Sequence, residues 1–458
     1  MADLSGENRA ASPVSLAPGD AEVVRSGLGR CASGSGELRH MRQRPRLLAV
    51  ALLVLVSLIM LNPAALASGP TLPSQDPFYT YSGSKPLGTI PPGTVLKHRS
   101  AQLAVGGGNS TPIRAEQLLY RTTGQLGRAT VTVTTVLEPA PTPILPRIVD
   151  YLSFYDGLGS QCDPSYTLAG GDAGDATYQQ EAEEEELLIT WYLSQGDIVT
   201  IPDFEGTGLH WMAGRESGYG ALDAIRATES YLRIGPATKV GLSGYSGGSV
   251  AADWASELAP AYGPKLNIVG VAEGGIPANY FDHFAYINGT VEYSAAIPGE
   301  LLGLSRAYGL DLTKYLSPYG RQVVQREGTA CIASVFGRYP GLTIGDIMLP
   351  AYRDLTRVAP FSIMLRDQTM GKAKTHPREP LLMAVGNVDG KGDGAMVAGD
   401  VRALARHYCR EGVPVDYQEY QGASHVQAAA YFEPQTGPFL QDRFAGAPFV
   451  SNCSYLGP

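Results

Sequence analysis

Basic side chains are scarce in this chain relative to acidic ones. Of 458 residues, 35 are Lys or Arg and 44 are Asp or Glu, which gives a formal net charge of −9. Nucleic acids and anionic membrane surfaces attract basic patches, so neither is expected as the main partner. Charged residues make up only 17% of the chain and hydrophobic residues 44%, which excludes wholesale disorder and allows a large core.

Cysteine is also rare, and no two cysteines have the Cys-x-x-Cys spacing of a redox or zinc site. Cys31 precedes the export signal described below, which leaves Cys162, Cys331, Cys409 and Cys453. An even number of cysteines in an exported chain predicts two disulfides, and the sequence alone allows three pairings.

The apolar run at residues 47–61 is too short for a membrane span, which needs about twenty residues. Three arginines within residues 42–46 precede it, and the small-residue sequence Ala-Leu-Ala-Ser follows at 65–68. Together they predict a secretory signal peptide cleaved after Ala67, with an uncleaved anchor as the alternative. Met41 stands where such a signal begins. The protein is therefore expected to be secreted, either extracellular or associated with the cell envelope.

Strand-like and helical patterns alternate along much of the chain. The expected strands are residues 131–136, 144–151, 197–201, 239–242, 267–272, 381–385 and 415–420. The expected helices are residues 176–193, 219–232, 249–259 and 398–410. This alternation predicts an α/β fold with a mainly parallel sheet and helices on both faces. The acidic cluster 181–186 is interpreted as a solvated helix face.

The alternation stops between residues 281 and 370, where helical fragments such as 321–327 replace it. This stretch is interpreted as an inserted, mostly helical cap. The expected domains are the N-terminal extension and signal peptide at 1–67, core at 68–280, cap at 281–370 and core again at 371–458. Residues 68–98, rich in Pro, Gly and Ser, are interpreted as an extended arm.

The sequence Gly244-Tyr245-Ser246-Gly247-Gly248 is the only Gly-x-Ser-x-Gly match in the chain. An apolar strand pattern precedes it and a helical pattern follows, which is the context of a nucleophile elbow. Ser246 is therefore the predicted nucleophile. The N–H of Gly247 is a predicted oxyanion donor, because the residue after the nucleophile has that role in this turn. The alternative is a Gly-rich turn without chemistry.

A serine nucleophile needs a histidine base, and this turn type places the residues in the chain order Ser, acid, His. Two histidines occur late enough in the chain, His407 and His425. His407 lies inside the expected helix 398–410 and is interpreted as a surface or packing residue. His425 follows the strand 415–420 in a loop, so it is the predicted base.

The acid is expected in the loop after the strand 381–385, which contains Asp389 and Asp393. Periodicity does not separate the two aspartates. Asp393 is followed by the apolar residues 395–397, which are able to anchor it, whereas the residues after Asp389 are Gly-rich. The loop lacks the Gly-Lys-Ser/Thr of a phosphate-binding loop.

Several segments together resemble the secretory lipase family. They are the elbow at 244–248, the segment Pro202-Asp203-Phe204-Glu205-Gly206, the helix 221–227 and the tail from Cys409 to His425. The resemblance runs from about Pro77 to Cys453. It implies an α/β-hydrolase fold, a helical cap over the active site, and hydrolysis of carboxylic esters including acylglycerols.

The resemblance also implies roles for single residues. It places the acid sixteen residues before the Cys of the Cys-x-x-Gly segment, which selects Asp393 over Asp389. It implies that the oxyanion hole is formed at Asp203 and Gly247. The disulfides that it implies are Cys162–Cys331 and Cys409–Cys453.

The expected protein is a lipase or carboxylesterase that acts on acylglycerol-type esters through Ser246, Asp393 and His425 and an acyl-enzyme. This chemistry needs no metal or organic cofactor. The expected partners are a lipid or other ester substrate and, transiently, a lipid interface, but no nucleic acid. Two alternatives stay open: a peptidase on the same fold, and a catalytically inactive surface-binding protein.

Overall fold

The computed structural model describes residues 69–104, 111–141, 143–174 and 176–457. The predicted signal peptide and its possible start at Met41 lie outside the described residues. Among the helices in the described ranges, none is long and apolar enough to cross a membrane.

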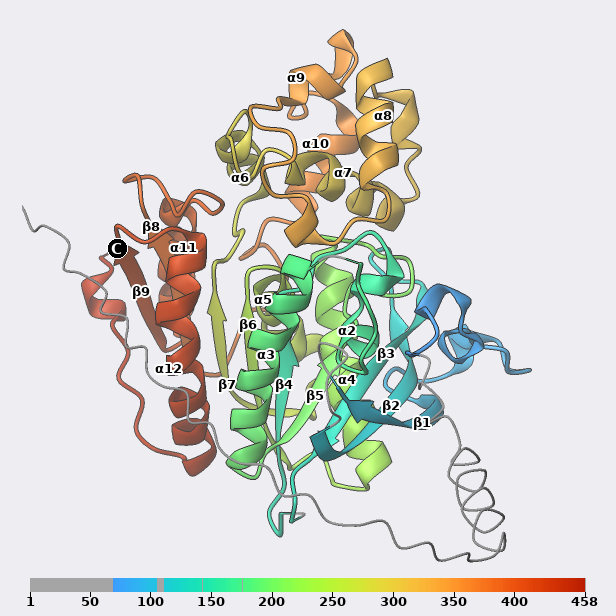
Figure 1. The fold of residues 1–458 in the computed structure, drawn as a ribbon. Helices are drawn as coiled ribbons and strands as arrows, with labels where there is room; N and C mark the ends of the chain where they lie inside the picture. The colour runs from blue at the N-terminus through green and yellow to red at the C-terminus, as the bar shows by residue number, and fades with distance from the viewer. Residues whose placement is uncertain (1–68, 105–110, 142, 175, 458) are drawn as a thin grey trace, which may run out of the picture. The chain divides into compact units, whose positions relative to one another are not determined.

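A nine-stranded sheet runs through the fold in the order β1-β2-β3-β5-β4-β6-β7-β8-β9 (Figure 1). Its strands are β1 Val95–Leu103, β2 Thr111–Thr123, β3 Ala129–Glu138, β4 Arg147–Leu152, β5 Ile198–Pro202, β6 Lys239–Tyr245, β7 Asn267–Gly274, β8 Leu381–Asn387 and β9 Val415–Gln421. The pairs from β1 to β5 are antiparallel. All pairs from β5 to β9 are parallel, so the predicted mainly parallel sheet is confirmed.

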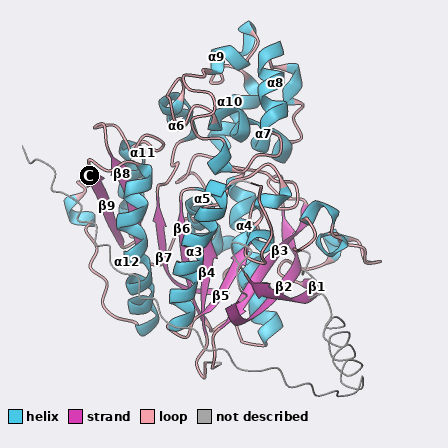
Figure 2. Ribbon diagram, viewed as in Figure 1, coloured by secondary structure: helices cyan, strands magenta, loops and turns pink. Residues whose placement is uncertain are grey.

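Helices cover both faces of this sheet (Figure 2). They are α2 Pro164–Thr167, α3 Ala176–Ser194, α4 Gly214–Leu232, α5 Gly247–Tyr262, α6 Tyr280–Ile287, α7 Ala296–Tyr308, α8 Pro318–Glu327, α9 Ile344–Ile347, α10 Ala359–Asp367, α11 Ala398–Arg410 and α12 His425–Ala445. Successive residues of a strand point to opposite faces. Ile148 of β4 accordingly packs in a core with α4, α5 and α11, and Val149 packs in a second core with α3 and α12.

Between β7 and β8 the chain leaves the sheet and forms the helices α6 to α10. Figure 1 shows these helices beyond the carboxyl ends of the parallel strands. The bond Cys162–Cys331 ties the segment after β4 to this helical stretch, and Cys409–Cys453 ties α11 to the C-terminal tail. Both predicted disulfide pairings are confirmed.

The structure differs from the sequence-based expectations at several places, and it adds the strands β1 and β2 before the first expected strand. The expected extended arm contains three short 3₁₀ turns, two of which pack against the sheet, and β1 already begins at Val95. Helix α12 was not expected, because Pro434 and Pro438 interrupt its pattern. Glu185 in the acidic cluster is buried, so that cluster is not wholly a solvated face.

Candidate active site

Ser246 lies at the sharp turn between β6 and α5 in a backbone conformation that non-glycine residues rarely adopt, with φ 51° and ψ −119°. The glycines on both sides allow the turn to close. A Cβ on Gly244 would overlap the Gly248 carbonyl, and a Cβ on Gly248 would overlap the carbonyl oxygen of Leu152. The strained serine and the close approach of strand and helix are the features of a nucleophile elbow.

His425 is the first residue of α12, immediately after the N-cap Ser424. Ser424 and Gln427 form a capping box, which fixes where the helix begins. The imidazole Nε2 lies 2.9 Å from Ser246 Oγ, so the hydroxyl is placed to donate to it. Only 6% of His425 is exposed, so this hydrogen bond is largely shielded from water.

Asp393 lies on the other side of the imidazole, in the loop after β8. His425 Nδ1 donates to Asp393 Oδ2 over 2.9 Å, and the backbone N–H of His425 donates to the Asp393 carbonyl over 2.8 Å. The second carboxylate oxygen accepts from the N–H groups of Ala395, at 2.9 Å, and Met396, at 2.6 Å. The three donors to the carboxylate hold it in one orientation, and Asp393 is 1% exposed.

Asp389 makes none of these contacts. It is exposed, and its Oδ1 accepts from the backbone N–H groups of Lys391 and Gly392 at 2.8 and 2.9 Å. Its Oδ2 accepts from the Tyr286 hydroxyl at 3.0 Å. Asp389 therefore closes its own turn, and the structure brings Asp393 to the histidine.

The expected role of Asp203 in the oxyanion hole is not supported and needs correction. Its backbone N–H donates to the Val133 carbonyl at 2.9 Å, as part of the pairing between β5 and β3. Its carboxylate accepts from the N–H and the hydroxyl of Ser165 at 2.9 and 2.6 Å. Asp203 follows β5, which is separated from the elbow strand β6 by β4.

Asp156 occupies the position that was expected for Asp203. It follows β4, the neighbour of β6, and it lines the cavity at Ser246 together with Gly247. A side chain on Gly247 would overlap the Asp156 carboxyl, so the two residues are in contact. The Gly247 N–H lies in the first turn of α5, where N–H groups lack an intrahelical acceptor. For the Asp156 N–H, no acceptor is found within the described ranges.

Asp156 and Glu205 also form a buried pair of carboxyl groups. Burial raises the pKa of Asp156 well above its usual range, and the Glu300 carboxyl raises it further. Burial and the neighbouring Asp156 raise the pKa of Glu205, whose carboxyl accepts from the Gly157 N–H at 3.1 Å. At least one of the two carboxyls is therefore neutral at pH 7.

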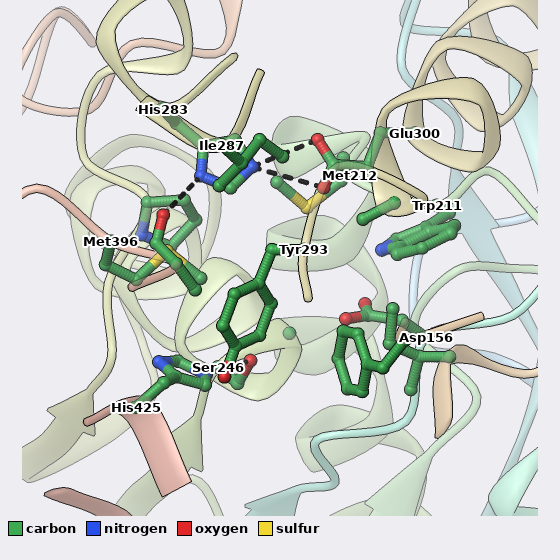
Figure 3. A pocket seen from close by; sticks show the side chains of 16 residues that line it. Asp156, Trp211, Met212, Ser246, His283, Ile287, Tyr293, Glu300, Met396 and His425 are labelled. Atoms are coloured by element: carbon green, nitrogen blue, oxygen red, sulfur yellow. Dashed lines mark hydrogen bonds and ion pairs between the residues drawn. The ribbon is translucent and has the colours of Figure 1, made fainter. Parts of the chain in front are cut away.

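Two cavities meet at Ser246. The first, which we call the cap-side cavity, is shown in Figure 3. It is bounded by α6, α7 and the acid loop, and its walls include Trp211, Met212 and Ile287. The second, the α12-side cavity, is lined by residues that include Phe154 and Val426. Ser246 lines both cavities, so each of them is able to hold one part of a substrate beside the serine.

The fold and this arrangement together define a class of protein. A mainly parallel sheet carries a serine at a strand–turn–helix elbow, and an aspartate and a histidine follow later strands. These are the features of the α/β-hydrolase fold, and the protein is a hydrolase of this type. Residues 175–452 match the secretory lipase family, and the chain belongs to that family.

Individual relatives agree with this assignment. A Mycobacterium tuberculosis protein named "Probable inactive lipase MT1628" is 34% identical, over 84% of this chain and 85% of that protein. Lipase A of Moesziomyces aphidis is 30% identical, over 82% of this chain and 80% of its own length. The closed-state structure of Candida antarctica lipase A has a TM-score of 0.76 and 28% identity, over 84% of this chain and 90% of that one.

Proposed function

We propose that the protein is a secreted lipase or carboxylesterase that hydrolyses acylglycerol-type esters with Ser246, His425 and Asp393. The observation that carries the proposal is the continuous hydrogen-bonded chain from the Ser246 hydroxyl through the imidazole to the Asp393 carboxylate, with 2.9 Å at both steps. The strained backbone of Ser246 supports it further, because such strain concentrates at functional sites.

In the proposed reaction, His425 Nε2 takes the hydroxyl proton as Ser246 Oγ attacks the ester carbonyl. Asp393 keeps the proton on Nδ1 and stabilises the imidazolium that forms. The imidazolium then gives its proton to the leaving alcohol, and the acyl group stays on Ser246. Water, deprotonated by the same imidazole, attacks the acyl-enzyme and releases the acid.

We assign the oxyanion hole to the backbone N–H groups of Gly247 and Asp156. In this fold the second donor comes from the loop after the strand beside the elbow strand, and here that strand is β4. Each such donor accounts for about 10²–10³ in kcat. We place the acyl group in the cap-side cavity and the alcohol in the α12-side cavity.

We further propose that residues 281–370 form the cap, between core segments 68–280 and 371–458. The helices α6 and α7 of this stretch bound the cap-side cavity, which supports a role in covering the acyl group. The family and its secreted relatives suggest an extracellular location, which agrees with the expected signal peptide.

A second candidate is a catalytically inactive binding protein, because the mycobacterial relative carries the name of an inactive lipase. Fluorophosphonate labelling separates the two candidates. We expect wild-type protein to be labelled at Ser246 and to cleave p-nitrophenyl esters, and Ser246→Ala to do neither. An unlabelled, properly folded wild type that cleaves no ester would favour the binding protein. Faster turnover of aminoacyl amides than of nitrophenyl esters would instead indicate a peptidase.

A further inference from the structure

A buried histidine that the proposed reaction does not use lies at the wall of the cap-side cavity. His283 comes from α6, and its partner Glu300 comes from α7 (Figure 3). Each of the two residues is only 3% exposed. His283 Nε2 lies 3.1 Å from both carboxylate oxygens of Glu300, and Nδ1 lies 3.1 Å from the carbonyl oxygen of Ala395.

Ala395 connects this histidine to the triad. Its N–H donates to Asp393 Oδ1 over 2.9 Å, while its carbonyl accepts from His283. Ala395 therefore contacts the helical insertion through its carbonyl and the Asp393 carboxylate through its N–H. The hydrogen bonds run from Glu300 through His283, Ala395 and Asp393 to His425.

We infer that His283 is a positioning residue for the hydrolytic reaction, which holds the acid loop from the cap so that Asp393 stays aligned with His425. The inference rests on the proposed function. His283 acts through Ala395 and Asp393.

The partners of the two ring nitrogens determine the protonation of His283. A carbonyl oxygen can only accept, so Nδ1 must carry a proton, and Nε2 faces a carboxylate. Burial by itself lowers the pKa of His283, but Glu300 on α7, the Ala395 carbonyl and Asp393 in the acid loop together raise it above the usual 6.5. Asp156, after β4, faces Glu300 from the far side of the cavity and has a raised pKa itself.

The contact with Ala395 therefore depends on pH. Below the raised pKa of His283, the imidazolium donates from both nitrogens. Above this pKa one proton leaves, and the remaining proton stays on Nε2, the nitrogen that faces the Glu300 carboxylate. Nδ1 then presents a lone pair to the Ala395 carbonyl, which breaks the contact with the acid loop. The positioning effect is full at low pH and is lost as the pH rises through the folded-state pKa of His283.

Three variants of the full chain test this, with p-nitrophenyl butyrate as substrate. His283→Leu removes both contacts, and we expect kcat to fall about 10–100-fold while KM changes less than about threefold, because a small misplacement of a catalytic group has such an effect. His283→Asn places an amide N–H near the position of Nδ1, and we expect it to recover most of the lost kcat. The matched control is His210→Leu, which also removes an imidazole–carboxylate pair, with Glu216, and should keep kcat within about twofold.

The third variant, Glu300→Gln, removes the charge that raises the pKa of His283. We expect the alkaline limb of the kcat profile to move to lower pH by about one unit. A purely structural role would lower stability without moving this limb. An unmoved limb, a loss through KM alone, or equal effects of His283→Leu and His210→Leu would overturn the inference. If His283→Leu does not fold, the Asn and Gln variants carry the test.

A separate readout distinguishes this inference from the proposed function. If wild-type protein cleaves no ester and takes no fluorophosphonate label, the proposed function fails. The tie to the acid loop is then measured by NMR of ¹⁵N-histidine-labelled protein. We expect two N–H signals for His283 at pH 6, and the downfield Nδ1 proton of His425 to weaken in His283→Leu. An unchanged His425 proton in that variant would overturn the inference whether or not the protein is an enzyme.

Discussion

The parallel strands β6 to β9 and the helical insertion α6 to α10 meet at Ser246, but they are specified in different ways. In the strand region each functional residue follows its own strand within a few positions. The insertion is instead connected to the core by contacts between distant residues. Cys162 and Cys331 are 169 residues apart, and His283 and Ala395 are 112 apart. Short motifs therefore reveal the first region and not the second.

The largest expected effect tests whether the chemistry belongs to the strand region alone. Ser246→Ala should lower ester turnover by about 10⁶, because the members of a triad act as a unit. Initial rates with p-nitrophenyl butyrate measure the loss, and an unchanged Tm shows that the fold is intact. Retention of more than about a tenth of the activity would place the nucleophile elsewhere.

The next effect compares two aspartates of one loop. Asp393→Asn should lower kcat by about 10⁴, because the amide favours the wrong tautomer of His425. Asp389→Asn alters only the contacts of its own turn and the contact with the Tyr286 hydroxyl, and should stay within about tenfold of the wild type. The reverse result, an inactive Asp389 variant beside an active Asp393 variant, would make Asp389 the acid.

The two disulfides allow the contributions of the helical insertion and of the C-terminal tail to the free energy of unfolding to be compared. Replacing Cys162 and Cys331 by serine, or Cys409 and Cys453, should lower the free energy of unfolding by roughly 2–4 kcal/mol in each case. The first bridge closes the longer loop, with separations of 169 and 44 residues, and should contribute about 1 kcal/mol more. Denaturant titrations of the two double variants measure this. Activity should fall only when the bridge to the insertion is removed, and equal activity in both variants would contradict that expectation.

The smallest expected effect concerns Glu185 on α3. Its carboxyl contacts the Ser153 hydroxyl and accepts from the Phe154 N–H at 2.8 and 2.9 Å, and burial raises its pKa to about 8. Because this value lies above the ordinary 4.5, the protonated form stabilises the fold at low pH, and the benefit is lost as the pH rises towards 8. Glu185→Gln should reduce the fall in Tm between pH 6 and pH 8.5 by a few degrees, and an unchanged slope would show that Glu185 is not responsible.

Local sequence was sufficient to predict the elbow at Ser246 and the histidine that lies beside it. The glycines around Ser246 are required because a side chain there would overlap neighbouring atoms. His425 follows strand β9 closely, although helix α12 was not expected. Asp156 could not be found in this way. Its proposed role as an oxyanion donor depends on β4 lying between β5 and β6, and the order of strands in a sheet is set by packing rather than by any residue near Asp156. The predicted strand at residues 144–151 ends shortly before Asp156, but only the strand order shows that this strand lies beside the elbow strand.

The same limit applied to Asp203 and to His283. Asp203 follows a strand, as an oxyanion donor should, but β3 pairs with that strand and takes its N–H. For His283, a position on a short helix gave no indication that Ala395 would lie beside it. The segments that could be predicted are those in which the local pattern and the tertiary contacts agree.

The contact between the backbones of Asp393 and His425 has a consequence for the entropy of the site. It closes a loop of 32 residues, and the entropic cost of such a closure is about 3 kcal/mol. The backbone hydrogen bond forms when the chain folds, so this cost does not recur in each turnover. The side-chain bond between carboxylate and imidazole joins two groups that are already neighbours. The orientation of the carboxylate and the imidazole is therefore set when helix α11 and strand β9, which lie within the loop, fold.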